Sequence, residues 1–222
     1  MAPDTAPVGV LALQGDFELH EKALARAGRP SRRVRRPAEL AGCGALIIPG
    51  GESTTLTRLI DRAGLREPIL EFAARGGHVL GTCAGLIMLA TRIDEDPARH
   101  GVRPLGLLDV LVRRNGYGRQ VDSFVDEVEM TAAAAGALGW YLGDGTAEVA
   151  GAADGGAGGE AAPGGARAAV PATMQGVFIR APRILEVGNG VEVIARHRGE
   201  PVGVRSGNVV GLTFHPEALA IA

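Results

Sequence analysis

The chain has 222 residues, of which 46% are hydrophobic and 22% charged, and its formal net charge is −2. These values are typical of one soluble globular domain, and the small net charge argues against a general affinity for nucleic acid or an anionic membrane. Two cysteines, Cys43 and Cys83, are too few for a disulfide framework, and the apolar run at 8–13 is too short for a signal peptide or a membrane span. A cytoplasmic protein is therefore expected.

Short apolar runs alternate with helical patterns in the first part of the chain. Strands are expected at 8–13, around Val34, at 45–48 and at 78–80, and helices at 16–28, 54–62, 67–75 and 86–91. Ser53 or Thr54 is the expected cap of the helix at 54–62. Strands and helices that alternate across short glycine-rich turns predict an α/β fold with a doubly wound, mostly parallel sheet and helices on both faces.

After residue 100 the pattern changes to strands without intervening helices. They are expected at 107–112, 124–130, 177–179, 191–196 and 201–205, and a last strand at 209–214 returns the chain to the core. This part predicts an antiparallel extension of the same sheet, so that residues 1–222 form a single domain.

One segment interrupts that pattern. Sixteen of the twenty residues at 150–169 are alanine or glycine, too few apolar side chains to offset the entropy of ordering them. A flexible surface insertion is expected at about 132–170, although 133–140 alone has a composition that a helix tolerates.

Cys83 lies in Gly81-Thr82-Cys83-Ala84-Gly85, between an expected strand and an expected helix. This is the setting of a nucleophile elbow, in which the helix N-terminus favours a thiolate and offers N–H groups to an oxyanion. A lone cysteine is more often a small buried residue, but the two flanking glycines favour the nucleophile.

His215-Pro216-Glu217 follows the last expected strand. In an extended segment alternate side chains face the same way, so His215 could contact the thiol while Glu217 orients the imidazole. On its own the tripeptide is more often a surface turn. Combined with Cys83 it predicts a Cys-His-Glu triad.

A third glycine-rich turn, Pro49-Gly50-Gly51-Glu52-Ser53-Thr54, also follows an expected strand. Its glycines permit backbone conformations barred to other residues, so the loop could supply an oxyanion N–H beside the nucleophile. The run lacks the spacing and the lysine of a nucleotide-binding P-loop. A purely structural turn is the alternative.

Six blocks in this order, LALQGDFELH, PGGEST, GTCAGLI, NGYGRQVDSF, GVFIRAP and TFHPE, carry a family resemblance. The chain resembles the glutaminase subunit of the two-protein pyridoxal 5′-phosphate synthase (the PdxT/SNO family), a class I, triad-type glutamine amidotransferase. The resemblance implies hydrolysis of glutamine to glutamate and ammonia, with Cys83 as nucleophile, His215 as general base and then acid, and Glu217 orienting His215.

The resemblance also implies further site residues. Those expected to contact glutamine are Gly51, Glu52, Ser53, Arg119, Ile179 and Arg180. Ala84 and the Gly50–Gly51 amide are expected to stabilise the oxyanion, and Gln14 is expected near that site and near a partner. An arginine suits the α-carboxylate of glutamine, which it can bind in a bidentate manner.

The family's partner is a synthase subunit with a (β/α)₈ barrel, which receives the ammonia through the protein. The resemblance implies a complex of twelve glutaminase and twelve synthase subunits, no cofactor or metal in this subunit, and the class labels hydrolase and lyase.

Two other functions remain open at this stage: the glutaminase subunit of another class I amidotransferase, such as that of histidine biosynthesis, and a non-catalytic docking subunit. The second alternative arises because the chain stops soon after Glu217 and could hold His215 poorly.

Outside the motifs, His20 is expected on a helix surface, where it could also face the partner. The five arginines at 29–36 are expected in a solvated loop rather than at an RNA or acidic-partner site.

Overall fold

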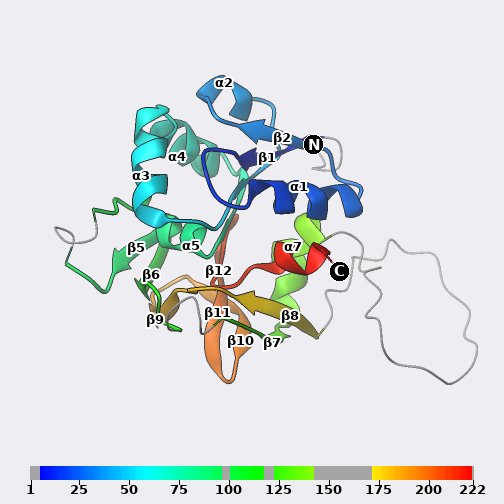
Figure 1. The fold of residues 1–222 in the computed structure, drawn as a ribbon, viewed down its shortest axis with the longest axis vertical. Helices are drawn as coiled ribbons and strands as arrows, with labels where there is room; N and C mark the ends of the chain where they lie inside the picture. The colour runs from blue at the N-terminus through cyan, green and yellow to red at the C-terminus, as the bar shows by residue number, and fades with distance from the viewer. Residues whose placement is uncertain (1–5, 97–100, 118–122, 143–171, 222) are drawn as a thin grey trace, which may run out of the picture.

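The computed structural model describes residues 6–96, 101–117, 123–142 and 172–221. Its strands are β1 (Val8–Leu11), β2 (Ser31–Val34), β3 (Ala45–Ile48), β4 (His78–Thr82), β5 (Ala90–Ile93), β6 (Leu108–Arg113), β7 (Phe124–Met130), β8 (Thr173–Phe178), β9 (Arg183–Val187), β10 (Glu192–His197), β11 (Glu200–Ser206) and β12 (Val209–Leu212). Its helices are α1 (Phe17–Arg26), α2 (Pro37–Leu40), α3 (Ser53–Arg62), α4 (Arg66–Ala74), α5 (Ala84–Leu89), α7 (Ala132–Leu142) and the 3₁₀ helix η2 (Pro216–Ile221) (Figure 1).

A nine-stranded sheet in the order β2-β1-β3-β4-β12-β11-β10-β7-β8 organises the molecule. The pairs from β2 to β12 are parallel, and those from β12 to β8 are antiparallel. The predicted α/β class, with a mostly parallel sheet and an antiparallel extension, is therefore confirmed. Ligands of such sheets bind beyond the carboxyl ends of the parallel strands, where the loops after β1, β3, β4 and β12 lie.

Helices cover both faces of the sheet, as predicted, and each face has its own buried cluster. Side chains of α3, α4 and α5 pack with Leu46, Ile48 and Val79 on one face. Side chains of α1 and α7 pack with Ile47 and Leu80 on the other. Neighbouring residues of one strand enter opposite clusters because side chains alternate across a strand. No helix in the described parts of the chain is long and apolar enough to cross a membrane.

The segment expected as a strand at 107–112 forms a second, smaller sheet instead of joining the antiparallel extension. Strand β6 pairs with β5 in parallel and with β9 in antiparallel orientation. The buried side chains of β6 alternate with less buried ones and enter the cluster of α3, α4 and α5. Residues 90–93, expected to belong to a helix in part, are extended because α5 already ends at Leu89.

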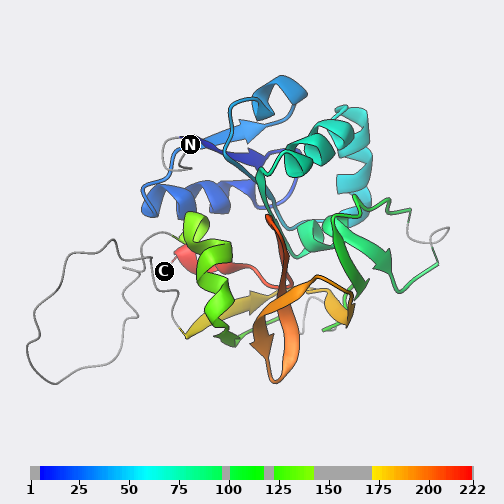
Figure 2. The ribbon, with the colours of Figure 1, turned by 180° about the vertical axis from the view of Figure 1, so that it is seen from behind.

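The expectation of a flexible insertion from about 132 is wrong for its first eleven residues, which form α7. Small side chains let this helix approach α1 and β10 closely, and Ala134, Ala137, Leu138 and Tyr141 are buried there. Figure 2 shows α7 beside the C-terminal turn, on the side of the molecule where α1 lies. The rest of the expected insertion, residues 143–171, lies outside the described residues.

The arginine-rich run at 29–36 is not only a loop, because four of its residues form the edge strand β2. The side chains of Arg33 and Arg36 pair with Glu21 and Glu39 on neighbouring helices. Pairs this exposed contribute little to stability, and they leave the run as a solvated edge.

Candidate active site

Cys83 stands at the turn between β4 and α5, at the carboxyl end of a central strand. It is the N-cap of α5 and has φ 50° and ψ −106°, a conformation that residues other than glycine rarely adopt. The turn is tight enough that a Cβ on Gly85 would lie 2.0 Å from the carbonyl oxygen of Ile48. Only a glycine therefore fits two residues after the cysteine. This explains the second glycine of the Gly81-Thr82-Cys83-Ala84-Gly85 motif.

His215 and Glu217 follow β12, the strand next to β4. The backbone N–H of His215 donates to the carbonyl of Val177 in β8 at 2.9 Å, and its Nδ1 lies 2.8 Å from Oε1 of Glu217. The segment after His215 is not extended as expected but turns into η2, and this turn brings Glu217 under the imidazole. Cys83 and His215 line the same pocket, and the Cys83 side chain is close enough to raise the pKa of the imidazole. The structure thus brings the three predicted residues together.

The electrostatics of this group depend on its burial. Burial disfavours the charged imidazole of His215, but the hydrogen bonds to Cys83 and Glu217 and their charges raise its pKa to about 10. Burial likewise opposes the charge of Glu217, whose pKa is nevertheless held well below its usual range by His20 and then by His215. An imidazolium between a thiol and a carboxylate is the arrangement that favours a thiolate near neutral pH.

The loop after β3 packs directly against the imidazole. A Cβ on Gly50 would lie 2.3 Å from Cε1 of His215, so only a glycine fits at this position without displacing the ring. Gln14, from the loop after β1, accepts a hydrogen bond from the backbone N–H of Glu52 at 3.2 Å and donates to its carbonyl at 3.4 Å. The amide of Gln14 therefore holds the glycine loop by both backbone groups of one residue.

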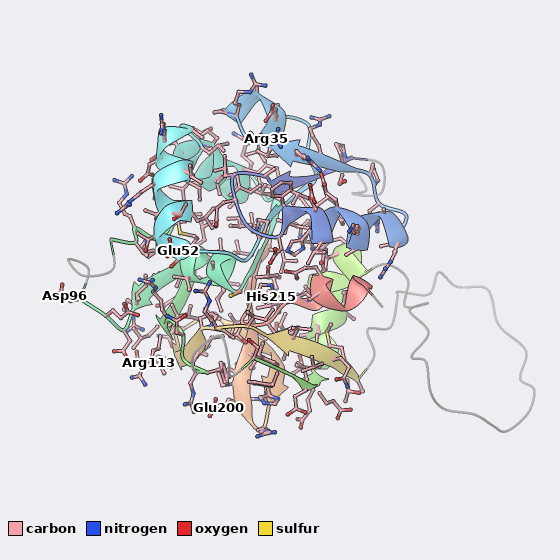
Figure 3. All side chains as sticks on the ribbon, viewed as in Figure 1. Arg35, Glu52, Asp96, Arg113, Glu200 and His215 are labelled. Carbon is pink, nitrogen blue, oxygen red and sulfur yellow. The ribbon has the colours of Figure 1, made fainter. Side chains whose placement is uncertain are left out.

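Glu52, rather than Ser53 or Thr54, caps α3. Its carboxylate accepts hydrogen bonds from the backbone N–H groups of Thr54 at 2.9 Å and Thr55 at 2.6 Å. Burial works against the charge, but these hydrogen bonds lower the pKa of Glu52 to about 2. The residue is thus a fixed negative charge at the N-terminus of α3. Figure 3 labels Glu52 there, together with His215.

One pocket collects most of the predicted site. Its lining includes Cys83, His215, Gly51, Glu52, Ser53, Ala84, Ile179 and Arg180. The thiol of Cys83 lies 3.8 Å from the carbonyl oxygen of Ile179. Gly50 is not among the lining residues, because it packs against the imidazole of His215. Arg119 lies outside the described residues, so its contact with a substrate stays a prediction.

Four further residues line the pocket that were not predicted as site residues: Asp16, Ile87, Arg114 and Asn115. Arg114 lies 3.7 Å from Oε1 of Glu52 and 3.6 Å from Oε2 of Glu95. Asp16, Ile87 and Asn115 lie within the sequence blocks quoted above, and Arg114 directly precedes one of them, so these blocks were the available signal. The pocket presents arginines and carboxylates together, which suits a zwitterionic amino acid.

Backbone strain gathers at this pocket. Within the described residues, four non-glycine residues have a positive φ, and three of them, Cys83, Asn115 and Arg180, line the pocket. Conformations of this kind cost free energy and persist where the surrounding structure enforces them, which is common at functional sites.

His20 is not on a helix surface, as the sequence suggested, but fully buried. Its Nε2 lies 3.2 Å from Oε1 of Glu217, so it contacts the member of the triad farthest from the thiol. The helical pattern of α1 gave no sign of this contact, because Glu217 lies at the other end of the chain.

The fold and the pocket together define an enzyme of the glutamine amidotransferase class. The chain belongs to the SNO glutamine amidotransferase family, whose sequence model matches residues 10–140 and 168–220.

Individual relatives agree with this assignment. A protein from Corynebacterium jeikeium described as "Pyridoxal 5′-phosphate synthase subunit PdxT" is 40% identical over 95% of this chain and 88% of its own length. A protein of the same description from Mycolicibacterium vanbaalenii is 43% identical over 95% and 89%. A crystal structure described as a glutamine amidotransferase matches with a TM-score of 0.73 and 37% identity, over 96% of this chain and 92% of that one.

The expectation that the label lyase applies to this chain is wrong. The matched family is described as a glutamine amidotransferase, and the relatives are described as the PdxT subunit, which supports a hydrolase-type glutaminase only.

Proposed function

We propose that this chain is the glutaminase subunit of a pyridoxal 5′-phosphate synthase, hydrolysing glutamine and passing the ammonia to a synthase subunit. One observation carries the proposal: a buried thiol and an imidazole, the latter held by a buried carboxylate, line a pocket that also contains arginines and carboxylates. The relatives at 40–43% identity are described as subunits of this synthase, which favours it over another class I amidotransferase.

The chemistry assigned to these residues takes two stages. The thiolate of Cys83 attacks the side-chain amide carbon of glutamine, and the oxyanion that forms accepts hydrogen bonds from Ala84 N–H and from the Gly50–Gly51 amide. His215 then gives its proton to the departing nitrogen, which leaves as ammonia, and a thioester with Cys83 remains. Water attacks the thioester, His215 takes its proton, and glutamate is released.

The substrate contacts follow from the charges of the pocket. Glu52 and Asp16 are placed to attract the α-ammonium group, whereas Arg114 and Arg180 suit the α-carboxylate. Gly51, Ser53, Ile179 and Arg119 complete the proposed binding set, the last by family resemblance alone.

The complex itself is also part of the proposal. A synthase subunit with a (β/α)₈ barrel is the proposed partner, in an assembly of twelve copies of each subunit, and a cytoplasmic location fits the sparse use of cysteine.

Glutamine turnover with and without a synthase subunit tests the function. We expect glutamate release that rises strongly when the synthase subunit is added, together with incorporation of ¹⁵N from amide-labelled glutamine into pyridoxal phosphate. Binding to the synthase subunit with no glutamate release would instead identify a docking subunit. Release stimulated only by another acceptor enzyme would assign the chain to a different amidotransferase.

A substitution at Gly50 tests how closely the loop fits His215. Gly50→Ala should lower kcat for glutamine by about 10²-fold, since displacing a catalytic group by about 1 Å has an effect of that size. The matched control is Gly139→Ala on α7, where a Cβ would meet nothing within 4 Å. Steady-state kinetics with the synthase subunit present give the comparison, and equal kcat values for the two variants would contradict the fit described here.

A further inference from the structure

His20 is a buried polar residue that the chemistry above does not use. It lies on α1 with no exposed surface, and Leu24 one turn further is the other buried residue of this helix. An imidazole in such a place costs free energy unless both ring nitrogens are hydrogen-bonded. Both nitrogens of His20 have partners, and the partners come from three distant segments.

Its Nε2 faces the triad. Oε1 of Glu217 and Oγ1 of Thr82 each lie 3.2 Å from this nitrogen. A carboxylate can only accept, so Nε2 carries the hydrogen that faces Glu217. Thr82 directly precedes Cys83 in the chain, and its hydroxyl lies a further 3.5 Å from the same carboxylate oxygen.

Its Nδ1 faces the hydroxyl of Tyr141, 3.0 Å away on α7. In the tautomer that carries its hydrogen on Nε2, Nδ1 is the acceptor, and the hydroxyl of Tyr141 is placed to donate to it. Burial, and then the charge of Glu217, raise the pKa of Tyr141 well above its usual value, so the phenol keeps the proton that it donates. In this tautomer the hydrogen bonds run in one direction, from Tyr141 to His20 and from His20 to Glu217.

The carboxylate of Glu217 depends on these donors. Oε1 receives both imidazoles, from His215 at 2.8 Å and from His20 at 3.2 Å. Oε2 is buried and has no hydrogen-bond partner among the described residues. Without His20, the orientation of this side chain would rest on His215 itself and on the long contact to Thr82, so the orienting group would lose its own support.

We propose that His20 is a positioning residue for the glutaminase reaction: it fixes Glu217 against His215, and Tyr141 selects the tautomer of His20 that can do so. The proposal rests on the proposed function, and it assigns α1 and α7 a role in catalysis without contact with the substrate. Residues that orient a catalytic ligand in this way typically change activity 10- to 100-fold when removed.

Three variants test the proposal. His20→Leu removes both hydrogen bonds and keeps the bulk, His20→Gln keeps an N–H donor near the place of Nε2, and Tyr141→Phe removes only the donor to Nδ1. For His20→Leu we expect kcat to fall by about 10- to 100-fold with KM within about threefold. His20→Gln should recover most of the loss, and Tyr141→Phe should lower kcat by roughly 3- to 10-fold, as one neutral hydrogen bond allows.

A second readout separates positioning from packing. The rate of Cys83 alkylation by iodoacetamide, followed against pH on the chain alone, reports thiolate formation and needs neither glutamine nor the synthase subunit. We expect the profile of His20→Leu to shift toward higher pH. Leu24→Ala, a packing loss on the same helix, should lower the melting temperature and leave the profile unchanged.

A wild-type alkylation profile and kcat in His20→Leu would overturn the proposal and leave His20 as a packing residue. If His20→Leu does not fold, Tyr141→Phe decides: kcat and alkylation equal to those of the wild type would also overturn it. Failure of the proposed function looks different, because the wild type would then release no glutamate with the synthase subunit, whatever the alkylation profiles of the variants.

Discussion

Cys83→Ala should lower kcat for glutamine by about 10⁴- to 10⁶-fold in the presence of the synthase subunit, the range seen when a covalent nucleophile is removed. The thiol forms the only covalent bond between enzyme and substrate in the proposed reaction, and neither His215 nor the oxyanion donors can replace it. Alanine retains the Cβ that the strained turn at φ 50° already accommodates, so the backbone should be unchanged. Glutamate release measured with a coupled dehydrogenase gives the rate.

The other cysteine of the chain supplies a matched control. Cys43 is half-buried, its thiol lies 3.5 Å from the carbonyl oxygen of Glu39, and it is not among the residues that line the pocket. Cys43→Ala should keep activity within about twofold of the wild type, the range expected of a substitution away from the chemistry. Full activity in Cys83→Ala, or equal losses in both variants, would contradict the role assigned to Cys83.

The parts of the site that lie within a single turn could be predicted from the local sequence. The glycines beside Cys83 and in the loop at 50–51 predict tight turns, and the structure agrees, since a Cβ on Gly85 would collide with Ile48 and one on Gly50 with His215. The alternation of strands and helices then places these turns at the same edge of a parallel sheet. The approximate position of the pocket follows from these two arguments.

Contacts between distant segments could not be predicted in this way. His20 reads as a polar position on a helix, and only the approach of Tyr141 and Glu217 makes its burial possible. Helix α7 reads as part of an alanine- and glycine-rich insertion, since its sequence has no apolar stripe; contact with α1 and β10 determines which side is buried. The cap of α3 is Glu52 rather than the expected Ser53 or Thr54, because the carboxylate of Glu52 accepts hydrogen bonds from the backbone N–H groups of Thr54 and Thr55.

The second large effect is expected at Glu217. Glu217→Gln should lower kcat by about 10³- to 10⁴-fold with little change in KM, by analogy with other orienting carboxylates of catalytic triads. The amide keeps the shape of the side chain, but it lacks the charge that stabilises the imidazolium of His215, whose pKa of about 10 depends partly on that charge. Kinetics at several pH values should show the alkaline loss of the remaining activity moved toward lower pH, because His215 in the variant loses more readily the proton that it gives to the departing nitrogen.

The same substitution has a signature in stability that does not depend on catalysis. The pKa of Glu217 in the folded chain lies well below its ordinary value of 4.5, despite burial, because of His20 and His215. A depressed pKa contributes stability that is present above 4.5 and is lost as the pH falls below it. The wild type should therefore lose more of its free energy of unfolding than Glu217→Gln between pH 6 and about pH 3.5. Urea unfolding across this range measures the difference, and since all other carboxylates are common to both proteins, parallel curves would show that Glu217 carries no such charge.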